Sequence, residues 1–316
     1  MIYLTGATGR LGNNIARYLQ NEGIPFTILL RKNGKALLDL NDVKYVFGDI
    51  FDPVFLSNNI SENDTLIHSA GFIDLNNHHK KECDSANYLG TEQIIDFCQK
   101  SKVRLIYIST VDCIPREKSQ GFISEPESLD VDNEGSNYTV SKGKATAYLL
   151  EKMKNEKMPA VILYPSAIIG INDFKPSALG KEIRKAMRRR ISFYFRGGYN
   201  FIDVRDCAKA VVECVKNNQS GCYILAANNR SVKQLLKEVG KVQNHKVFLI
   251  GVPVFLVRTF SFLIPDISDF MIDTMTDNYN YDNSLMLRDL VPEPFTFEKT
   301  VDDTVKWFSE NEHIFE

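Results

Sequence analysis

The 316-residue chain lacks an excess of charge of either sign: 38 lysines and arginines face 40 aspartates and glutamates, for a formal net charge of −2. A general nucleic-acid binder needs a clear basic excess, so this balance argues against nucleic acid as a partner. The six cysteines form no CxxC pair, and no N-terminal segment resembles a secretory leader. These absences predict a cytoplasmic protein with reduced thiols.

A long uninterrupted apolar run is also missing. The most apolar stretch, residues 247–265, is broken by Gly251, Pro253 and Arg258, whereas a bilayer core requires about 20 apolar residues in a row. The pattern predicts a short strand and then a buried helix that starts near Pro253, with an apolar lid over a lipophilic substrate as the alternative. We therefore expect no membrane span.

Short β-rich runs alternate with helical patterns, and the chain has no internal repeat and no low-complexity segment. Helices are predicted at residues 87–100 and 138–154. Near-continuous apolar runs, typical of strands covered on both faces, lie at residues 2–4, 26–30, 43–47, 65–70, 104–110, 160–166 and 222–227. This alternation predicts an α/β fold with a Rossmann-type, doubly wound parallel sheet.

The regular alternation changes after residue 170. We predict a Rossmann domain over residues 1–170 and a smaller C-terminal lobe over residues 171–316 that is mainly substrate-binding. Residues 201–227 are expected to return from this lobe to the Rossmann sheet.

Two patterns near the start of this lobe leave alternatives open. The basic run 181–190 is interpreted as a solvated helix face, and an anion site for a diphosphate substrate is the alternative. In the aromatic strand 191–195, Phe193, Tyr194 and Phe195 either line a pocket or pack in a core.

Three glycines, Gly6, Gly9 and Gly12, follow the first predicted strand, at a spacing that differs from GxGxxG. Apolar residues recur at helical spacing after them, so the glycines fall at a strand-to-helix turn. Glycine lets the chain turn tightly there and lets a phosphate approach the peptide N–H groups at the positive end of a helix. The turn therefore predicts a pyrophosphate site.

A tyrosine and a lysine, Tyr138 and Lys142, stand one helical turn apart, which places the ammonium on the same helix face as the phenol. Tyrosine has a pKa near ~10, so acid–base work at neutrality needs a pKa lower by about 3, and a nearby lysine favours the phenolate. The strand at 104–110 ends on Ser109 and Thr110, hydroxyls that can bond a substrate oxygen at the carboxyl edge of the sheet. Together these residues indicate nicotinamide-dependent carbonyl chemistry.

These motifs resemble those of the extended short-chain dehydrogenases/reductases, in the NAD-dependent epimerase/dehydratase superfamily, over nearly the whole chain. The resemblance implies that Thr110, Tyr138 and Lys142 are catalytic and that Asn87 is a structural or proton-relay residue. The segments TGATGRLG, GDI, HSAG and YPS correspond to the family's cofactor contacts, which implies these binding residues: Gly6, Thr8, Gly9, Arg10, Leu11, Gly12, Asp49, Ile50, Ala70, Gly71, Lys142, Pro165 and Ser166.

Two further segments narrow the resemblance. GGYNFIDVRDCAKAVV (197–212) and TVKWF (304–308) are similar to the dihydroflavonol-reductase and 3β-hydroxysteroid-dehydrogenase-like branch rather than to the sugar-nucleotide epimerases. The chain departs from the family pattern at Thr110, where serine is more usual, and at 113–115, where CIP replaces the VYG of many sugar-nucleotide enzymes.

The cofactor prediction rests on the end of the second strand. A carboxylate about 20 residues after the glycines would bind the ribose diol of NAD, but this chain has Arg31 and Lys32 there, with Arg10 in the phosphate turn. These cations favour NADP over NAD; the alternative is that Arg31 and Lys32 only solubilise a loop. His78 and His79 have no second ligand pair nearby, so no metal is expected.

The sequence therefore predicts an NADPH-dependent reductase, or reverse dehydrogenase, of a ketone or aldehyde on an apolar small molecule. The rival enzyme is a sugar-nucleotide epimerase or dehydratase with bound NAD. The rival outside catalysis is an NADP-binding redox sensor. The resemblance also implies a homodimer.

Overall fold

The computed structural model describes residues 1–32, 34, 40, 43–116, 121–131, 135–244, 247–259 and 269–315. Its strands are β1 Ile2–Thr5, β2 Phe26–Leu30, β3 Lys44–Phe47, β4 Thr65–His68, β5 Arg104–Ile108, β6 Ala160–Pro165, β7 Ala167–Ile169, β8 Ile191–Tyr194, β9 Gly198–Asp203, β10 Gly221–Leu225, β11 Asn228–Ser231 and β12 Phe248–Gly251. Its helices are α1 Arg10–Asn21, α2 Pro53–Ser57, α3 Lys80–Cys83, α4 Gly90–Ser101, α5 Asn137–Asn155, α6 Ala178–Arg188, α7 Val204–Lys216, α8 Val232–Val242, α9 Val254–Thr259, α10 Asp269–Asp277, α11 Ser284–Asp289 and α12 Phe297–Glu310.

The central sheet has seven parallel strands in the order β10-β6-β5-β4-β1-β2-β3. The Rossmann-type fold is confirmed, and each of the seven predicted apolar runs supplies one of these strands. The run predicted at 65–70 is shorter as a strand, because β4 ends at His68 and the next residues turn away over the sheet edge. All residues of β2 and β6 are buried, as expected for strands covered on both faces.

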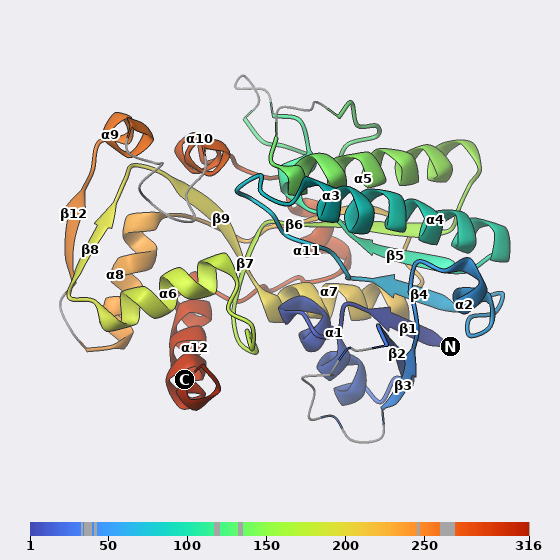
Figure 1. Cartoon of the computed structure of the whole chain (residues 1–316). Helices are drawn as coiled ribbons and strands as arrows, with labels where there is room; N and C mark the ends of the chain where they lie inside the picture. The colour runs from blue at the N-terminus through green and yellow to red at the C-terminus, as the bar shows by residue number, and fades with distance from the viewer. Residues whose placement is uncertain are drawn as a thin grey trace.

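Helices cover both faces of this sheet (Figure 1). On one face α1 and α7 pack together, and α1 contributes Ile15, Ala16 and Leu19 to the core at helical spacing. On the other face lie α2, α4 and α5, with Ile94 and Leu149 among the buried residues. The carboxyl ends of the strands therefore open between two helical layers, which is where ligands bind in such folds.

The C-terminal lobe has its own small sheets and core. β7, β9 and β11 form a three-stranded sheet, and β8 pairs with β12. Helices α6, α8 and α12 pack against the first of these around Phe201, Phe297 and Phe308. Within residues 201–227, β10 joins the edge of the Rossmann sheet and α7 covers its face, while the last residues of β9 stay in the lobe.

The apolar stretch 247–265 differs from its prediction in one respect. β12 supplies the short strand, and α9 begins directly after Pro253, but the helix is not buried: in α9 only Val257 is inaccessible, because only one face of this short helix contacts the lobe. Residues 260–265 lie outside the described part of the chain. Within that part, no helix is long and apolar enough to cross a membrane.

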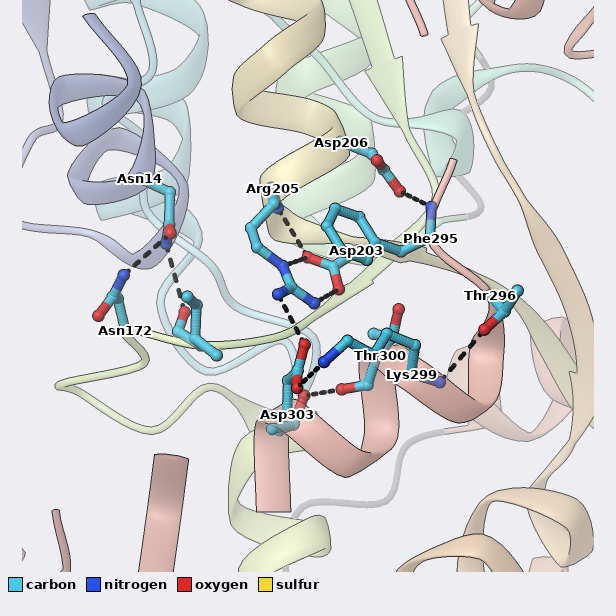
Figure 2. A network of polar contacts seen from close by, with 12 residues as sticks. Asn14, Asn172, Asp203, Arg205, Asp206, Phe295, Thr296, Lys299, Thr300 and Asp303 are labelled. Carbon is cyan, nitrogen blue, oxygen red and sulfur yellow. Dashed lines mark hydrogen bonds and ion pairs between the residues drawn. The ribbon is translucent and has the colours of Figure 1, made fainter. Parts of the chain in front are cut away.

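An arginine network ties the lobe to the Rossmann core (Figure 2). Arg205, at the start of α7, donates two hydrogen bonds to the buried carboxylate of Asp203, at 2.9 and 2.7 Å, and a third to Asp303 of α12 at 2.7 Å. Its guanidinium lies 3.8 Å from the centre of the Phe295 ring. The Phe295 N–H in turn donates to Asp206 at 2.9 Å. Because Asp203 is fully buried, its charge depends on Arg205 for compensation.

Replacing Arg205 with methionine should therefore destabilise the fold. Arg205→Met keeps an apolar stem but leaves the Asp203 carboxylate buried without its cation, which should lower the unfolding free energy by about 3 kcal/mol. Urea denaturation monitored by circular dichroism measures this. Arg288→Met is the matched control, since its pair with Asp289 is exposed and should change the free energy by less than about 0.5 kcal/mol.

Candidate active site

The glycine turn lies at the centre of the sheet edge, between β1 and α1. Gly6 has a φ of +77°, and a Cβ on it would lie 2.5 Å from the backbone nitrogen of Ala70, so the turn accepts only glycine there. Gly12 also needs to be glycine, because a Cβ there would overlap the carbonyl group of Gly6. Gly9 caps α1 in an extended conformation and with no side-chain hydrogen bond, and a Cβ on it would contact only the Gly6 carbonyl. The helix N-terminus is thus open to an approaching phosphate.

The remaining residues of the turn, Thr8, Arg10 and Leu11, differ in their contacts. Thr8 and Leu11 are half-buried, and Leu11 packs against the core. Arg10 points toward the C-terminal lobe: its guanidinium donates to the Ile168 carbonyl at 2.6 Å and pairs with Asp173 at 3.4 Å. The positive charge of Arg10 is therefore engaged by the lobe, which leaves Arg31 and Lys32 as the basis of the NADP prediction.

Those two cations follow β2 and are exposed, although residues 33 and 35–39 beyond them lie outside the described part of the chain. The N–H of Gly48 donates to the Leu30 carbonyl at 2.8 Å, so the ends of β2 and β3 lie side by side. Asp49 is exposed and accepts from the N–H of Phe51 at 3.0 Å, while the neighbouring Ile50 is buried.

The side chain of Lys142, on α5, reaches the carboxyl end of β5 and is almost fully buried. Its Nζ donates to the Ile108 carbonyl at 2.8 Å and lies 4.7 Å from the centre of the Tyr107 ring. Burial lowers the pKa of Lys142 to about 8. A Cβ on Gly71 would come within 3.6 Å of Nζ, so the residues after β4, Ala70 and Gly71, reach the same point from the other side.

Thr110 follows the end of β5, and Tyr138, on α5, lies near the turn after Thr110. Thr110 is buried and its hydroxyl accepts from the Asp112 N–H at 3.2 Å, which begins a short turn, Val111–Cys113. Burial raises the pKa of Tyr138, and the nearby Asp112 and Cys113 raise it further. The expectation of a lowered Tyr138 pKa is wrong for the protein alone, because burial is the largest influence on this pKa and raises it.

Asn87 has a structural role in this arrangement. It is fully buried in a π-helical turn, Asp84–Leu89, and its amide oxygen accepts from the Phe72 N–H at 2.8 Å. Its Nδ2 donates to the Phe72 carbonyl at 2.7 Å and to Ser141 at 3.1 Å. These bonds hold the loop after β4 against α5. Nothing in them requires a proton relay.

Pro165 ends β6, and the next residue, Ser166, forms part of the floor of a small cavity. The Ser166 hydroxyl donates to Asn200 at 3.3 Å. The cavity measures about 30 Å³, and the turn after Thr110 forms another part of its wall, together with Tyr199 of β9 and Tyr279 and Tyr281 after α10. Phe193–Phe195 do not line it: Phe193 is exposed, and Phe195 is buried in a separate cluster with Val257 and Ile272.

One charged pair beside this cavity was not predicted from the sequence. Arg116 forms an ion pair with Asp112, donates to Thr274 at 3.4 Å and lies 5.2 Å from the centre of the Tyr279 ring. The Nε of Arg116 and the Oδ1 of Asn278 are buried without a hydrogen-bond partner. Asn278 and Thr274 line the cavity, so an unpaired donor and an unpaired acceptor lie at or beside it. These residues come from separate segments that show no common motif.

The strand order, the glycine turn at its centre and the two covering helical layers define a Rossmann-type α/β protein. The chain belongs to the NAD dependent epimerase/dehydratase family, whose model matches residues 2–225. Enzymes of this family depend on NAD or NADP, and the open turn before α1 fits a dinucleotide, because nothing but backbone lies beside Gly9.

Relatives of full length support the predicted resemblance, which is confirmed. The chain is 23% identical to sterol demethylase protein B of Methylococcus capsulatus, over 97% of this chain and 98% of that protein. It is 25% identical to a putative dihydroflavonol 4-reductase of Synechocystis sp., over 99% and 95%. The crystal structure of the Bordetella bronchiseptica enzyme WbmH in complex with NAD⁺ has the same fold, with a TM-score of 0.77 at 18% identity over 98% of both chains.

A buried histidine beneath this site predicts how stability responds to acid. His68 lies between Thr5, at 2.8 Å, and Thr91, at 3.2 Å, and burial, with a smaller effect of Lys142, lowers its pKa from 6.5 to about 3. Between these pH values the unfolded chain binds a proton that the folded protein excludes. Stability should therefore fall as the pH falls from 6.5 toward 3, by about 4 kcal/mol in total.

Chemical denaturation across this pH range measures the effect. His68→Gln removes the titrating ring, so its stability should depend less steeply on pH than that of the wild type. His313→Gln, at an exposed histidine, is the control and should keep the wild-type slope. Equal slopes for wild type and His68→Gln would contradict the assignment of a neutral, buried imidazole.

Proposed function

We propose that the protein is an NADP(H)-dependent oxidoreductase that reduces a ketone or aldehyde on a small molecule. The proposal rests on one observation: Thr110, after β5, and Tyr138 and Lys142, both on α5, lie at the carboxyl end of β5, beside the loop after β4 that contacts the glycine turn. Such an arrangement suits proton transfer to a carbonyl oxygen next to a bound nicotinamide.

Each of the three side chains has a distinct task in this proposal. Tyr138 donates the proton, and its raised pKa keeps the hydroxyl protonated at neutral pH, as the reductive direction requires. The Thr110 hydroxyl orients the substrate oxygen. Lys142 supplies positive charge at the site and would bind the ribose hydroxyls of the cofactor. When bound, the cofactor supplies the hydride.

The cofactor would be held by the glycine turn, by Ala70 and Gly71, and by Pro165 and Ser166. Arg31 and Lys32 would meet the 2′-phosphate of NADP, since no carboxylate follows β2 in the described chain. All six cysteines are free, which supports a reducing, cytoplasmic setting.

The cavity supports a substrate with both apolar and polar parts. The rings of Tyr199, Tyr279 and Tyr281 provide apolar surface, while Asn278, which lines the cavity, has an unpaired Oδ1 that could accept a hydrogen bond from a polar group of the substrate. In the basic run 181–190, Lys185 pairs with Glu182 and Arg188 with Glu312 at exposed positions, which favours a solvated helix face over a diphosphate site. We therefore favour the reductase over the sugar-nucleotide epimerase.

Removing the Tyr138 hydroxyl tests this function. A panel of apolar aldehydes and ketones should consume NADPH, and Tyr138→Phe should lower turnover by about 10² or more with little change in cofactor affinity. Tyr148→Phe on the same helix is the control, since its hydroxyl bonds Asp96 at the surface. Near wild-type turnover by Tyr138→Phe would overturn the role, and epimerisation of a nucleotide sugar with tightly held NAD would replace the function.

Cofactor preference tests the charges after β2. Wild-type protein should bind NADPH at least about tenfold more tightly than NADH, which corresponds to about 1.4 kcal/mol. Arg31→Asp should narrow or reverse the ratio, because it would repel the 2′-phosphate. Lys44→Asp, exposed at the opposite end of β3, should leave the ratio unchanged. Equal affinities in calorimetric titrations of the wild type would contradict the assignment.

A further inference from the structure

The two-stranded sheet β8–β12 exposes a wholly apolar outer face. The register pairs Ile191 with Phe248 and Phe193 with Ile250, so these four side chains share one face of the sheet. Their exposed fractions are 52%, 69%, 66% and 45% respectively, whereas Ser192 between them is buried on the opposite face. A solvated sheet face normally carries polar residues, so this pattern is the reverse of the usual one.

The apolar face continues into α9. The Val252 N–H donates to the Tyr194 carbonyl at 2.7 Å, which fixes the start of α9 at the end of the sheet. Phe255 and Leu256 of α9 are 67% and 37% exposed. In Figure 1 these elements form the end of the molecule opposite the β1–β3 side of the Rossmann sheet. We call the exposed set the apolar tip: Ile191, Phe193, Phe248, Ile250, Phe255 and Leu256.

The two chain segments that carry the apolar tip are strongly basic. Residues 188–198 and 247–259 contain five arginines and no aspartate or glutamate, which gives these two segments a charge of +5. The chain as a whole carries −2, so the remaining residues carry −7. Acidic side chains reach some of these arginines: Glu312 pairs with Arg188 and Asp273 with Arg258, both at exposed positions where ion pairs are weak, and Asp269 also acts on Arg258.

The arginines flank the apolar tip at more than one point. Three of them, 188–190, immediately precede β8, and the Arg190 carbonyl accepts from the N–H of Phe248 at 2.8 Å. Arg196 follows β8, and Arg258 lies on α9. Aromatic side chains bordered by arginines match a lipid surface, in which rings enter the boundary between headgroups and acyl chains and guanidinium groups meet the phosphates.

We propose that the apolar tip docks the protein on the surface of an anionic lipid bilayer. The contact is peripheral, since the tip consists of two short strands and one short helix. A second copy of the chain fits less well, because a two-fold axis through the tip would set one arginine cluster against the other. An apolar insertion combined with basic charge is the pair of signals that gives stable, lipid-selective binding.

This surface is separate from the proposed active site. The small cluster of Phe195, Val257 and Ile272 lies beneath the tip, and the tip residues do not line the cavity near Thr110. Lipid binding is therefore independent of turnover, and its failure would leave the proposed reductase untouched.

Vesicle flotation with the full chain tests the proposal. Wild-type protein should float with vesicles of phosphatidylcholine and phosphatidylserine, and at least about tenfold less with phosphatidylcholine alone. Phe193→Ser with Phe248→Ser should weaken the binding at least about tenfold, and so should Arg190→Glu with Arg196→Glu. Phe122→Ser is the matched control, because Phe122 is also 66% exposed but lies outside the tip.

Thermal melting and NADPH titration establish that each variant is folded, and the two variant pairs perturb the surface in different ways. Absence of wild-type binding to the anionic vesicles would overturn the proposal. So would full binding by the two-phenylalanine variant. A wild-type dimer seen by light scattering, lost in that variant and accompanied by no vesicle binding, would assign the tip to a second copy instead.

Discussion

A buried ammonium group, that of Lys142, is the point on which the site depends. Removing it from water is costly, and the structure compensates with the Ile108 carbonyl at 2.8 Å and the face of the Tyr107 ring. The hydrogen bond from Lys142 to Ile108 joins α5 to the end of β5. The positive charge of Lys142 also helps to lower the pKa of His68, which therefore stays neutral. Gly71 lies beside the ammonium, and a Cβ there would contact Lys142 and press on the Asn87 amide oxygen at 3.2 Å. The ammonium of Lys142 is thus held in place by residues of the core itself.

A second set of buried charges lies between the C-terminal lobe and the Rossmann core. Arg205 of α7 bonds both Asp203, at the end of β9, and Asp303 of α12, so it holds the lobe in a fixed position against the Rossmann core. In this position Tyr199 lies beside the turn after Thr110. The pocket is thus made where the two parts of the fold meet, which is common for small-molecule sites.

Apolar side chains in the lobe are divided between two uses. Phe201 and Phe308 fill a core with their neighbours, whereas Phe193 and Phe248 remain exposed because they lie on the outer face of a sheet that has a partner layer on one side only. The same strand alternation that buries Ser192 therefore exposes the phenylalanines. An apolar sequence in this region does not by itself mean an apolar pocket.

The sequence by itself determined the sheet, its covering helices and the place of the glycine turn. Near-continuous apolar runs such as β2 and β6 are typical of strands with both faces covered, and Gly6 stands where the backbone has a positive φ and the chain of Ala70 approaches closely. Only the tertiary structure decided the direction of the Tyr138 pKa, the capture of Arg10 by Asp173, the pairing of Asp112 with Arg116 and the exposure of α9. Those properties depend on what surrounds a side chain, and its surroundings come from segments far apart in the chain, so no local pattern records them.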